Sequence, residues 1–242
     1  MLTFVGLGAL LLQIAASDLK SAPISTDRPD FTEGSRAVPV GALQFETGMT
    51  YEELNGAGNA TSIGEALIRY GFQPGSELRL ALPNHLSVNG TSTDVTGFGD
   101  VAIGFKQELN GDEKVEFALL GQVAFRTGDA GLRAAHTTPM AAFIWATESG
   151  GTSFGGQIQA EWPGGRTDLR HTFVVGFPAG DRLGAFVEHV VDFGETMRPG
   201  HILHFGLTFQ PDRDTQWDFH IGFGVSNGAP DSFVGFGYAR RT

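Results

Sequence analysis

Charged side chains recur at alternate positions through most of this 242-residue sequence, and they are its main candidates for chemistry. Each lies opposite an apolar residue in a stretch of period two, which is typical of a β-strand with one polar and one apolar face. A polar face that lines a lumen can select the solutes that pass it. We therefore predict a lining formed by Glu46, Glu65, Arg69, Arg79, Asp100, Lys106, Glu116, Arg126, Glu161, Arg170, Glu188, Asp218 and His220.

Two glycine-rich motifs and the histidines suggest other chemistries, but their surroundings argue against each. Residues 97–102 fit the dinucleotide motif G-x-G-x-x-A, yet a strand follows them where that motif needs a helix. Residues 151–155 fit the hydrolase motif G-x-S-x-G, yet they join a turn to a strand. His201 and His204 are three residues apart, on opposite faces of a strand, and the seven histidines form no compelling cluster. We predict no catalytic residue, no metal site and no cofactor.

The alternation runs from Leu43 to Arg241 without a competing helical period. It predicts an all-β fold of about twelve antiparallel strands. The predicted strands cover residues 43–52, 65–72, 77–86, 97–109, 115–126, 138–147, 154–162, 168–177, 183–193, 203–210, 217–225 and 233–241.

The connections between these strands alternate in predicted length. Tight turns rich in Pro, Asn, Asp and Gly occupy residues 73–76, 110–113, 148–151, 178–181 and 211–214. Between them we expect longer links at residues 54–63, 87–96, 127–137, 194–200 and 226–232, with 163–166 as a short exception. A meander with tight turns at one end and long loops at the other is typical of an outer-membrane β-barrel. An even number of strands would place both termini at the tight-turn end.

The composition narrows the class of partner. The formal net charge of −11 disfavours nucleic acid, because phosphate binding needs a basic surface. The absence of cysteine excludes a disulfide framework and a thiolate metal site.

The first forty residues divide into two parts. Residues 1–17 contain an apolar run closed by small residues, which resembles a secretory signal peptide without the usual basic start. Residues 18–40 contain three prolines and are predicted to form an extended N-terminal arm. This arm is either a flexible leader or a segment tucked into the body, with Asp27, Arg28 and Asp30 paired to fixed charges. Residues 41–242 are predicted to form a single barrel domain.

Alternation alone does not distinguish a soluble barrel from a membrane barrel, since the two differ only in which face is outside. Aromatic residues near strand ends favour contact with lipid, as in the interfacial girdles of membrane barrels. They are Tyr51, Phe72, Trp162, Phe177, Phe193, Trp217 and Tyr238. We predict a transmembrane antiparallel up-and-down β-barrel in the bacterial outer membrane.

Three segments carry a resemblance to a known family. They are residues 26–31 (TDRPDF), residues 97–106 (GFGDVAIGFK) and the closing stretch 222–238. Together they resemble the family named for a putative meta-pathway of phenol degradation, over about residues 25–241. The resemblance implies a transporter-like outer-membrane β-barrel of a Gram-negative bacterium.

The predicted function is a passive channel for small molecules, including aromatic or hydrophobic ones. The expected partners are membrane lipid, the solute and, during biogenesis, the barrel assembly machinery. Two alternatives stay open: an outer-membrane acyl hydrolase using His171 or His189 on the outer wall, and a soluble periplasmic barrel that binds a ligand.

Overall fold

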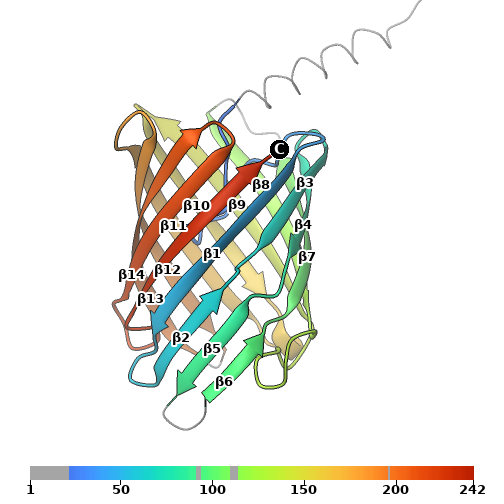
Figure 1. Cartoon of the computed structure of the whole chain (residues 1–242), viewed down its shortest axis with the longest axis vertical. Helices are drawn as coiled ribbons and strands as arrows, with labels where there is room; N and C mark the ends of the chain where they lie inside the picture. Colours follow the sequence, from blue (N-terminus) through green and yellow to red (C-terminus); the bar gives the residue numbers. More distant parts are fainter. Residues whose placement is uncertain (1–21, 91–93, 110–113, 196) are drawn as a thin grey trace, which may run out of the picture.

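The computed structural model describes residues 22–90, 94–109, 114–195 and 197–242 as a single β-sheet closed into a barrel (Figure 1). The predicted signal peptide, residues 1–17, and the first residues of the predicted arm lie outside the described residues. Over the described ranges, no helix is long and apolar enough to cross a membrane.

Within the described ranges, fifteen strand segments make up the sheet, and each pairs antiparallel with its neighbours. Pairing of the first segment with the last closes the barrel, from Gln44 opposite Arg241 to Glu53 opposite Ser232. The segments are β1 (Leu43–Glu53), β2 (Gly58–Ile63), β3 (Leu67–Gln73), β4 (Ser76–Ala81), β5 (His85–Gly90), β6 (Asp94–Phe98), β7 (Val101–Leu109), β8 (Val115–Phe125), β9 (Thr138–Ser149), β10 (Thr152–Glu161), β11 (Asp168–Pro178), β12 (Leu183–Gly194), β13 (Met197–Asp212), β14 (Thr215–Gly224) and β15 (Ser232–Arg241), with a short 3₁₀ turn at Pro163–Gly165.

Twelve wall strands result, because three pairs of segments each continue one another across a short break. These pairs are β2 with β3, β4 with β5, and β6 with β7. Gly64, with a φ of 75°, lies in the first break. Pro83, which has no amide hydrogen for a ladder bond, lies in the second. The predicted all-β barrel of about twelve strands is confirmed.

The predicted long links are wrong at three places. Residues 54–63 and 87–96 contain β2, most of β5 and part of β6, and β13 begins at Met197 rather than at 203. The first two stretches are rich in Gly, Asn, Ser and Thr on both faces, so they lack the apolar alternation that reveals a strand in contact with lipid. They nevertheless pair with one another and lengthen the wall at its lower end in Figure 1. Long loops remain at 126–137 and 225–231.

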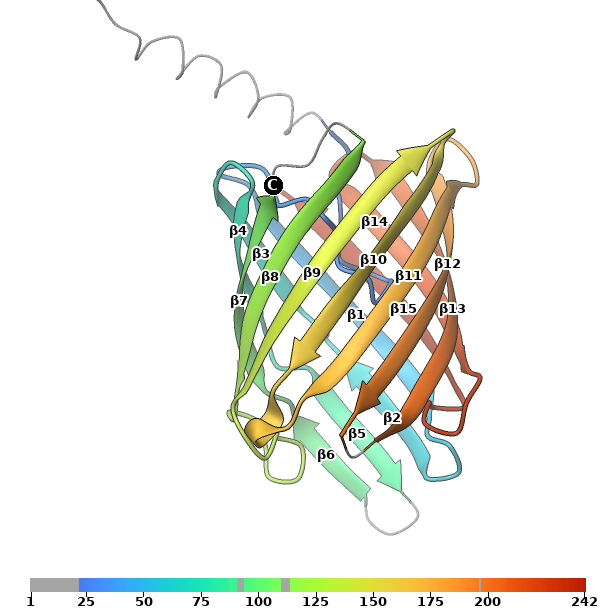
Figure 2. The same ribbon diagram turned by 180° about the vertical axis from the view of Figure 1, so that it is seen from behind.

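The two ends of the barrel differ as predicted. Two-residue turns such as 74–75, 150–151 and 213–214 lie at the end where the C-terminus and the arm are found, called here the tight-turn end (Figures 1 and 2). The opposite, or loop, end carries residues 126–137 and 225–231. Short turns mark the periplasmic side of an outer-membrane barrel.

The faces of the wall are the reverse of those in a soluble protein. Ile158 and Leu207 are 58% and 52% exposed on the outside, whereas the interior residues Arg69 and Lys106 are completely buried. The predicted girdle residues Tyr51, Phe72, Trp162, Phe177, Phe193 and Trp217 are also exposed. An apolar exterior around a polar interior is the arrangement of a membrane-spanning barrel. It contradicts the alternative of a soluble barrel.

Candidate functional site

The N-terminal arm occupies the interior of the barrel. It enters at the tight-turn end, where the amide of Ile24 donates a hydrogen bond to Arg213 O at 2.6 Å. It returns to the same end, where the amide of Gly41 bonds to Gly71 O at 2.7 Å, and then continues into β1. Between these points the arm forms a loop whose neck is closed by a 2.8 Å bond from the Gly34 amide to Asp27 Oδ1.

Side chains of the wall accept hydrogen bonds from the arm's backbone amides. Glu188 accepts from the amides of Phe31 and Thr32 at 2.9 and 2.8 Å. Glu46, Gln157, Glu108 and Glu77 accept from the amides of Asp27, Glu33, Ala37 and Val38 in the same way. Buried amides need such partners, and carboxylate acceptors make stronger bonds than neutral ones. Much of the acidic interior therefore serves to hold the arm.

Three wall cations converge on one arm carboxylate. Asp27 lies 2.9 Å from Lys106 Nζ and 3.2 Å from Arg69 Nη1, and it also pairs with Arg79. Arg69 and Arg79 are direct cross-strand neighbours on β3 and β4, so their like charges would repel without a shared anion. Glu33 of the arm adds a 2.8 Å ion pair to Arg79.

The arm carboxyl groups respond differently to burial. Burial alone would raise the pKa of Asp27, but Arg69, Lys106 and Arg79 hold it well below its ordinary value. Burial raises the pKa of Glu33 to about 7. Burial, reinforced by the Glu188 carboxylate, raises the pKa of Asp30 well above its ordinary value.

On the opposite wall, a chain of hydrogen bonds lies against Phe31. Glu188 bonds to His204 Nδ1 at 2.8 Å, and His204 Nε2 lies 3.0 Å from His220 Nδ1. The Phe31 ring packs edge-on against His204, with ring centroids 5.2 Å apart. Alternation alone did not pair His204 with His220, because their contact depends on the register between β13 and β14. The opposite faces predicted for His201 and His204 are observed, since His201 contacts the outward His189 at 3.3 Å.

Glycines on the inner wall make room for the tip of the arm, residues 28–31. Gly48 and Gly237 face each other across the β1–β15 pair. A Cβ on Gly48 would lie 2.2 Å from Arg28 Nη2, and one on Gly237 would lie 2.4 Å from Arg28 Nε. Arg28 also pairs with Glu65 at 2.8 Å and lies 3.5 Å from Asp218. The paired glycines thus form a seat for the guanidinium group.

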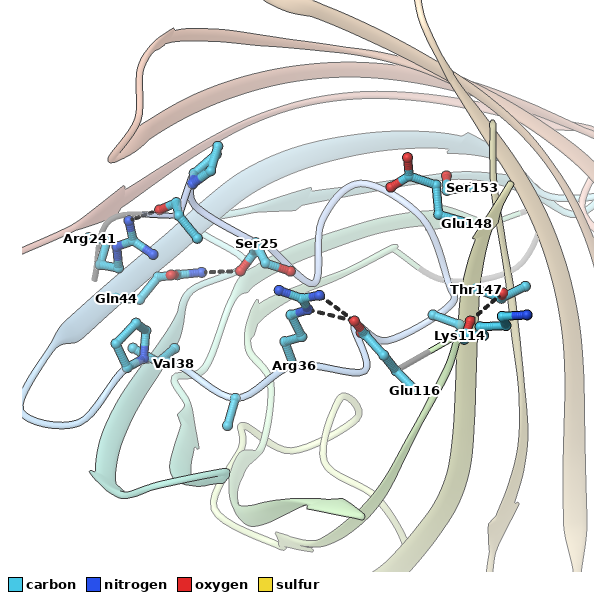
Figure 3. Close-up of a pocket in the computed structure, with 15 residues that line it drawn as sticks. Ser25, Arg36, Val38, Gln44, Lys114, Glu116, Thr147, Glu148, Ser153 and Arg241 are labelled. Atoms are coloured by element: carbon cyan, nitrogen blue, oxygen red, sulfur yellow. Dashed lines mark hydrogen bonds and ion pairs between the residues drawn. The ribbon is translucent and has the colours of Figure 1, made fainter. Parts of the chain in front are cut away.

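Cavities lie on both sides of the tip. One of about 660 Å³ opens toward the tight-turn end and is lined by Arg182, Phe186 and Gln216 among others. One of about 480 Å³ lies toward the loop end, beside Leu86, Arg170 and Phe233. Arg28, Pro29 and Asp30 line both, so the tip lies between the two. A further cavity of about 560 Å³ at the tight-turn end is crossed by the Arg36–Glu116 ion pair (Figure 3).

The structure brings most of the predicted lining residues into this interior. Glu46, Arg69, Arg79, Lys106, Glu188, Asp218 and His220 are buried there. Glu65, Glu116 and Arg170 contact the arm, the last with its guanidinium 5.0 Å from the Phe31 ring centroid. Glu161 lines a smaller cavity near the loop end.

Two predicted lining residues, Asp100 and Arg126, bind a loop at the end of the barrel instead of lining the lumen. Asp100 lies in the break between β6 and β7 and accepts bonds from the amides of Gly128 and Ala134. Arg126 is exposed just beyond β8 and donates to Ala134 O. Both hold the 126–137 loop, because β7 begins only at Val101 and β8 ends at Phe125, within the predicted strands 97–109 and 115–126. The predicted pairing of Asp30 with a fixed charge is wrong, because Asp30 forms no ion pair in the part of the chain that the structure describes.

The prediction omitted several residues that hold the arm. Glu77, Gln157, Thr172 and His204 are each at most 1% exposed and contact the arm or its anchors. Glu77 and Gln157 were recognisable as polar-face residues of their strands. Glu33 of the arm carried no strand pattern, so the alternation could not place it.

The geometry gives no support for the hydrolase alternative. His171 lies exposed on the outer wall, and His189 bonds to His201. Neither forms a hydrogen bond with a serine among the residues described here. Across the same residues, no group of three or more His, Asp or Glu side chains is arranged to hold a metal ion.

Similar proteins share this architecture. An outer membrane channel from Pseudomonas putida F1 superposes with a TM-score of 0.69 at 12% identity, over 88% of this chain and all of that one. The KdgM porin, solved with disordered oligogalacturonate, gives 0.58 at 8% identity, over 82% of this chain and 98% of that one. The NanC porin gives 0.56 at 10% identity, over the same shares of the two chains.

These likenesses show a common barrel fold, which is the architecture of bacterial outer-membrane proteins and agrees with the predicted location. No curated protein matches the sequence. A family model matches residues 26–242, which include the arm from Thr26 onward as well as the whole barrel. The chain belongs to the family described as "Putative MetA-pathway of phenol degradation".

Proposed function

We propose that the protein is a passive outer-membrane channel for small organic molecules, and that its N-terminal arm controls passage through the lumen. The observation that carries this proposal is the position of the arm tip. Arg28, Pro29 and Asp30 separate a cavity facing the tight-turn end from one facing the loop end. Movement of this one segment would join the two cavities.

The cavities suit small solutes with an apolar part. The one toward the loop end has a volume of about 480 Å³ and is lined by Phe31, Leu86, Ile202 and Phe233 together with charged groups. A cavity of about 150 Å³ is enough for benzene. The family's description refers to phenol degradation, which supports aromatic compounds as one class of solute.

Recording the conductance of the full chain in planar lipid bilayers tests the proposal. A variant lacking residues 24–36 is the comparison, with its strand content checked by circular dichroism. We expect discrete current steps from both proteins, with the larger open fraction for the shortened variant, because its arm cannot reach the tip position. Absence of current from both folded proteins would contradict the channel function.

A further inference from the structure

The three-cation site, defined as Arg69, Arg79 and Lys106, depends on the arm for its charge balance. Among the residues that the structure describes, the wall supplies two carboxylates within 4 Å of these cations, Glu46 and Glu77. The arm supplies the other two, Asp27 and Glu33. If the arm leaves, three buried cations face the lumen with only two anions, so the wall at this level becomes net positive.

The contacts of Asp27 are those expected of a bound carboxylate ligand. Both of its oxygens lie within 3.0 Å of Lys106 Nζ, and Arg69 and Arg79 approach from two other strands. The Asp27 side chain is 3% exposed, so the charge is enclosed by the cations that neutralise it. Arginine is well suited to planar carboxylates because its donors are arranged as a fork.

The site also retains binding capacity that the arm does not use. Within the described residues, the buried Nε of Arg79 has no hydrogen-bond partner. The cations lie on β3, β4 and β7, which are adjacent wall strands, so they remain together when the arm moves. A rigid wall carrying three clustered cations is a preorganised anion site.

We propose that Arg69, Arg79 and Lys106 form a binding site for small organic carboxylates, which Asp27 and Glu33 occupy in place of the solute while the arm is docked. A carboxylate solute that reaches the site competes with the arm and favours its release. This inference rests on the proposed channel function and adds the chemical class of the solute.

Bilayer recordings of the full chain with benzoate or benzyl alcohol at equal concentration test the inference. The two compounds share an aromatic ring and differ in charge. We expect benzoate, and not benzyl alcohol, to increase the open fraction. The increase should be lost in Arg79→Gln and retained in Arg126→Gln, a matched charge removal at an exposed residue just beyond β8.

A second measurement uses the double variant Asp27→Asn with Glu33→Gln. Its reversal potential in a salt gradient should shift toward chloride selectivity relative to the unaltered chain, because the cations lose both arm carboxylates. Should this variant not fold, the benzoate comparison on the unaltered chain still decides the question.

The outcomes separate the two proposals. Equal effects of benzoate and benzyl alcohol, or a benzoate effect that survives in Arg79→Gln, would overturn the carboxylate site while leaving the channel function intact. Absence of current from the full chain and from the variant lacking residues 24–36 would overturn the channel function and, with it, this inference.

Discussion

Glu188 holds the tip of the arm, and replacing it with glutamine should release the arm. Its carboxylate accepts bonds from the amides of Phe31 and Thr32 and from the Thr32 hydroxyl, all between 2.7 and 2.9 Å. A carboxamide has one oxygen, so one of the two amides would face an NH₂ group and lose its acceptor. Hydrogen bonds to charged groups contribute about 1.5 to 3 kcal/mol, and an unsatisfied buried donor costs about 1 to 3 kcal/mol.

We expect Glu188→Gln to weaken docking of the arm by about 2 to 3 kcal/mol, which raises the undocked population roughly 30- to 150-fold. The chain contains no cysteine, so Ser35→Cys supplies a unique thiol in the arm. Ser35 is 7% exposed, and a thiol there should react with a maleimide mainly when the arm is undocked.

The matched control is Glu161→Gln on the same Ser35→Cys background. Glu161 is an interior glutamate that accepts a hydrogen bond from Gln159, and among the described residues it forms no hydrogen bond or ion pair with the arm. Equal labelling rates for Glu188→Gln and Glu161→Gln, with both barrels folded, would contradict the role of Glu188 in holding the arm.

Three further predictions concern the seat of the tip, pH and the outer wall. Gly48→Val should raise the open fraction in bilayers, because the valine side chain would occupy the place of the Arg28 guanidinium. The control Gly121→Val should leave the open fraction unchanged, because a Cβ at Gly121 meets nothing within 4 Å. The pKa of Glu33 is about 7 in the docked arm, against 4.5 for an ordinary glutamate, so the docked arm binds this proton more tightly than the undocked arm does. Docking should therefore weaken as the pH rises from 4.5 through about 7. The open fraction should therefore be larger at pH 8 than at pH 5.5, and an equal or smaller fraction at pH 8 would contradict the role given to Glu33. Ile158→Arg should destabilise the barrel in lipid vesicles by roughly 2 to 4 kcal/mol, measured by urea unfolding, whereas Asn89→Arg, in the polar wall extension, should have little effect.

The barrel was predictable from the sequence because contact with lipid imposes strict alternation. Val101, Ile103 and Phe105 of β7 illustrate this, since only one face of the strand can touch lipid. The polar stretches of β2 and β5 were not predictable in the same way, because outside the apolar band neither face has to be hydrophobic. Their strand pairing depends on neighbours that are distant in sequence.

The interior site was predictable in composition but not in arrangement. Alternation identified Arg69, Arg79 and Lys106 as inward-facing residues, and the arm pattern singled out Asp27 and Arg28. Their meeting depends on a loop of irregular backbone whose path is set by amide contacts with Glu46, Glu188 and Gln157. No periodicity encodes such contacts. The Glu188–His204–His220 chain likewise depends on the register between β12, β13 and β14.

The most direct test of the arm's role is to fix it to the wall and then release it. Thr32 and Thr172 are buried, and their Oγ1 atoms are 2.6 Å apart, close to the roughly 2.05 Å that separates two disulfide sulfurs. In bilayers, the double variant Thr32→Cys with Thr172→Cys should stay closed when oxidised and regain its open fraction after reduction, while each single variant is insensitive to reductant. An oxidised, crosslinked protein that conducts as well as the reduced one would contradict control of the lumen by the arm.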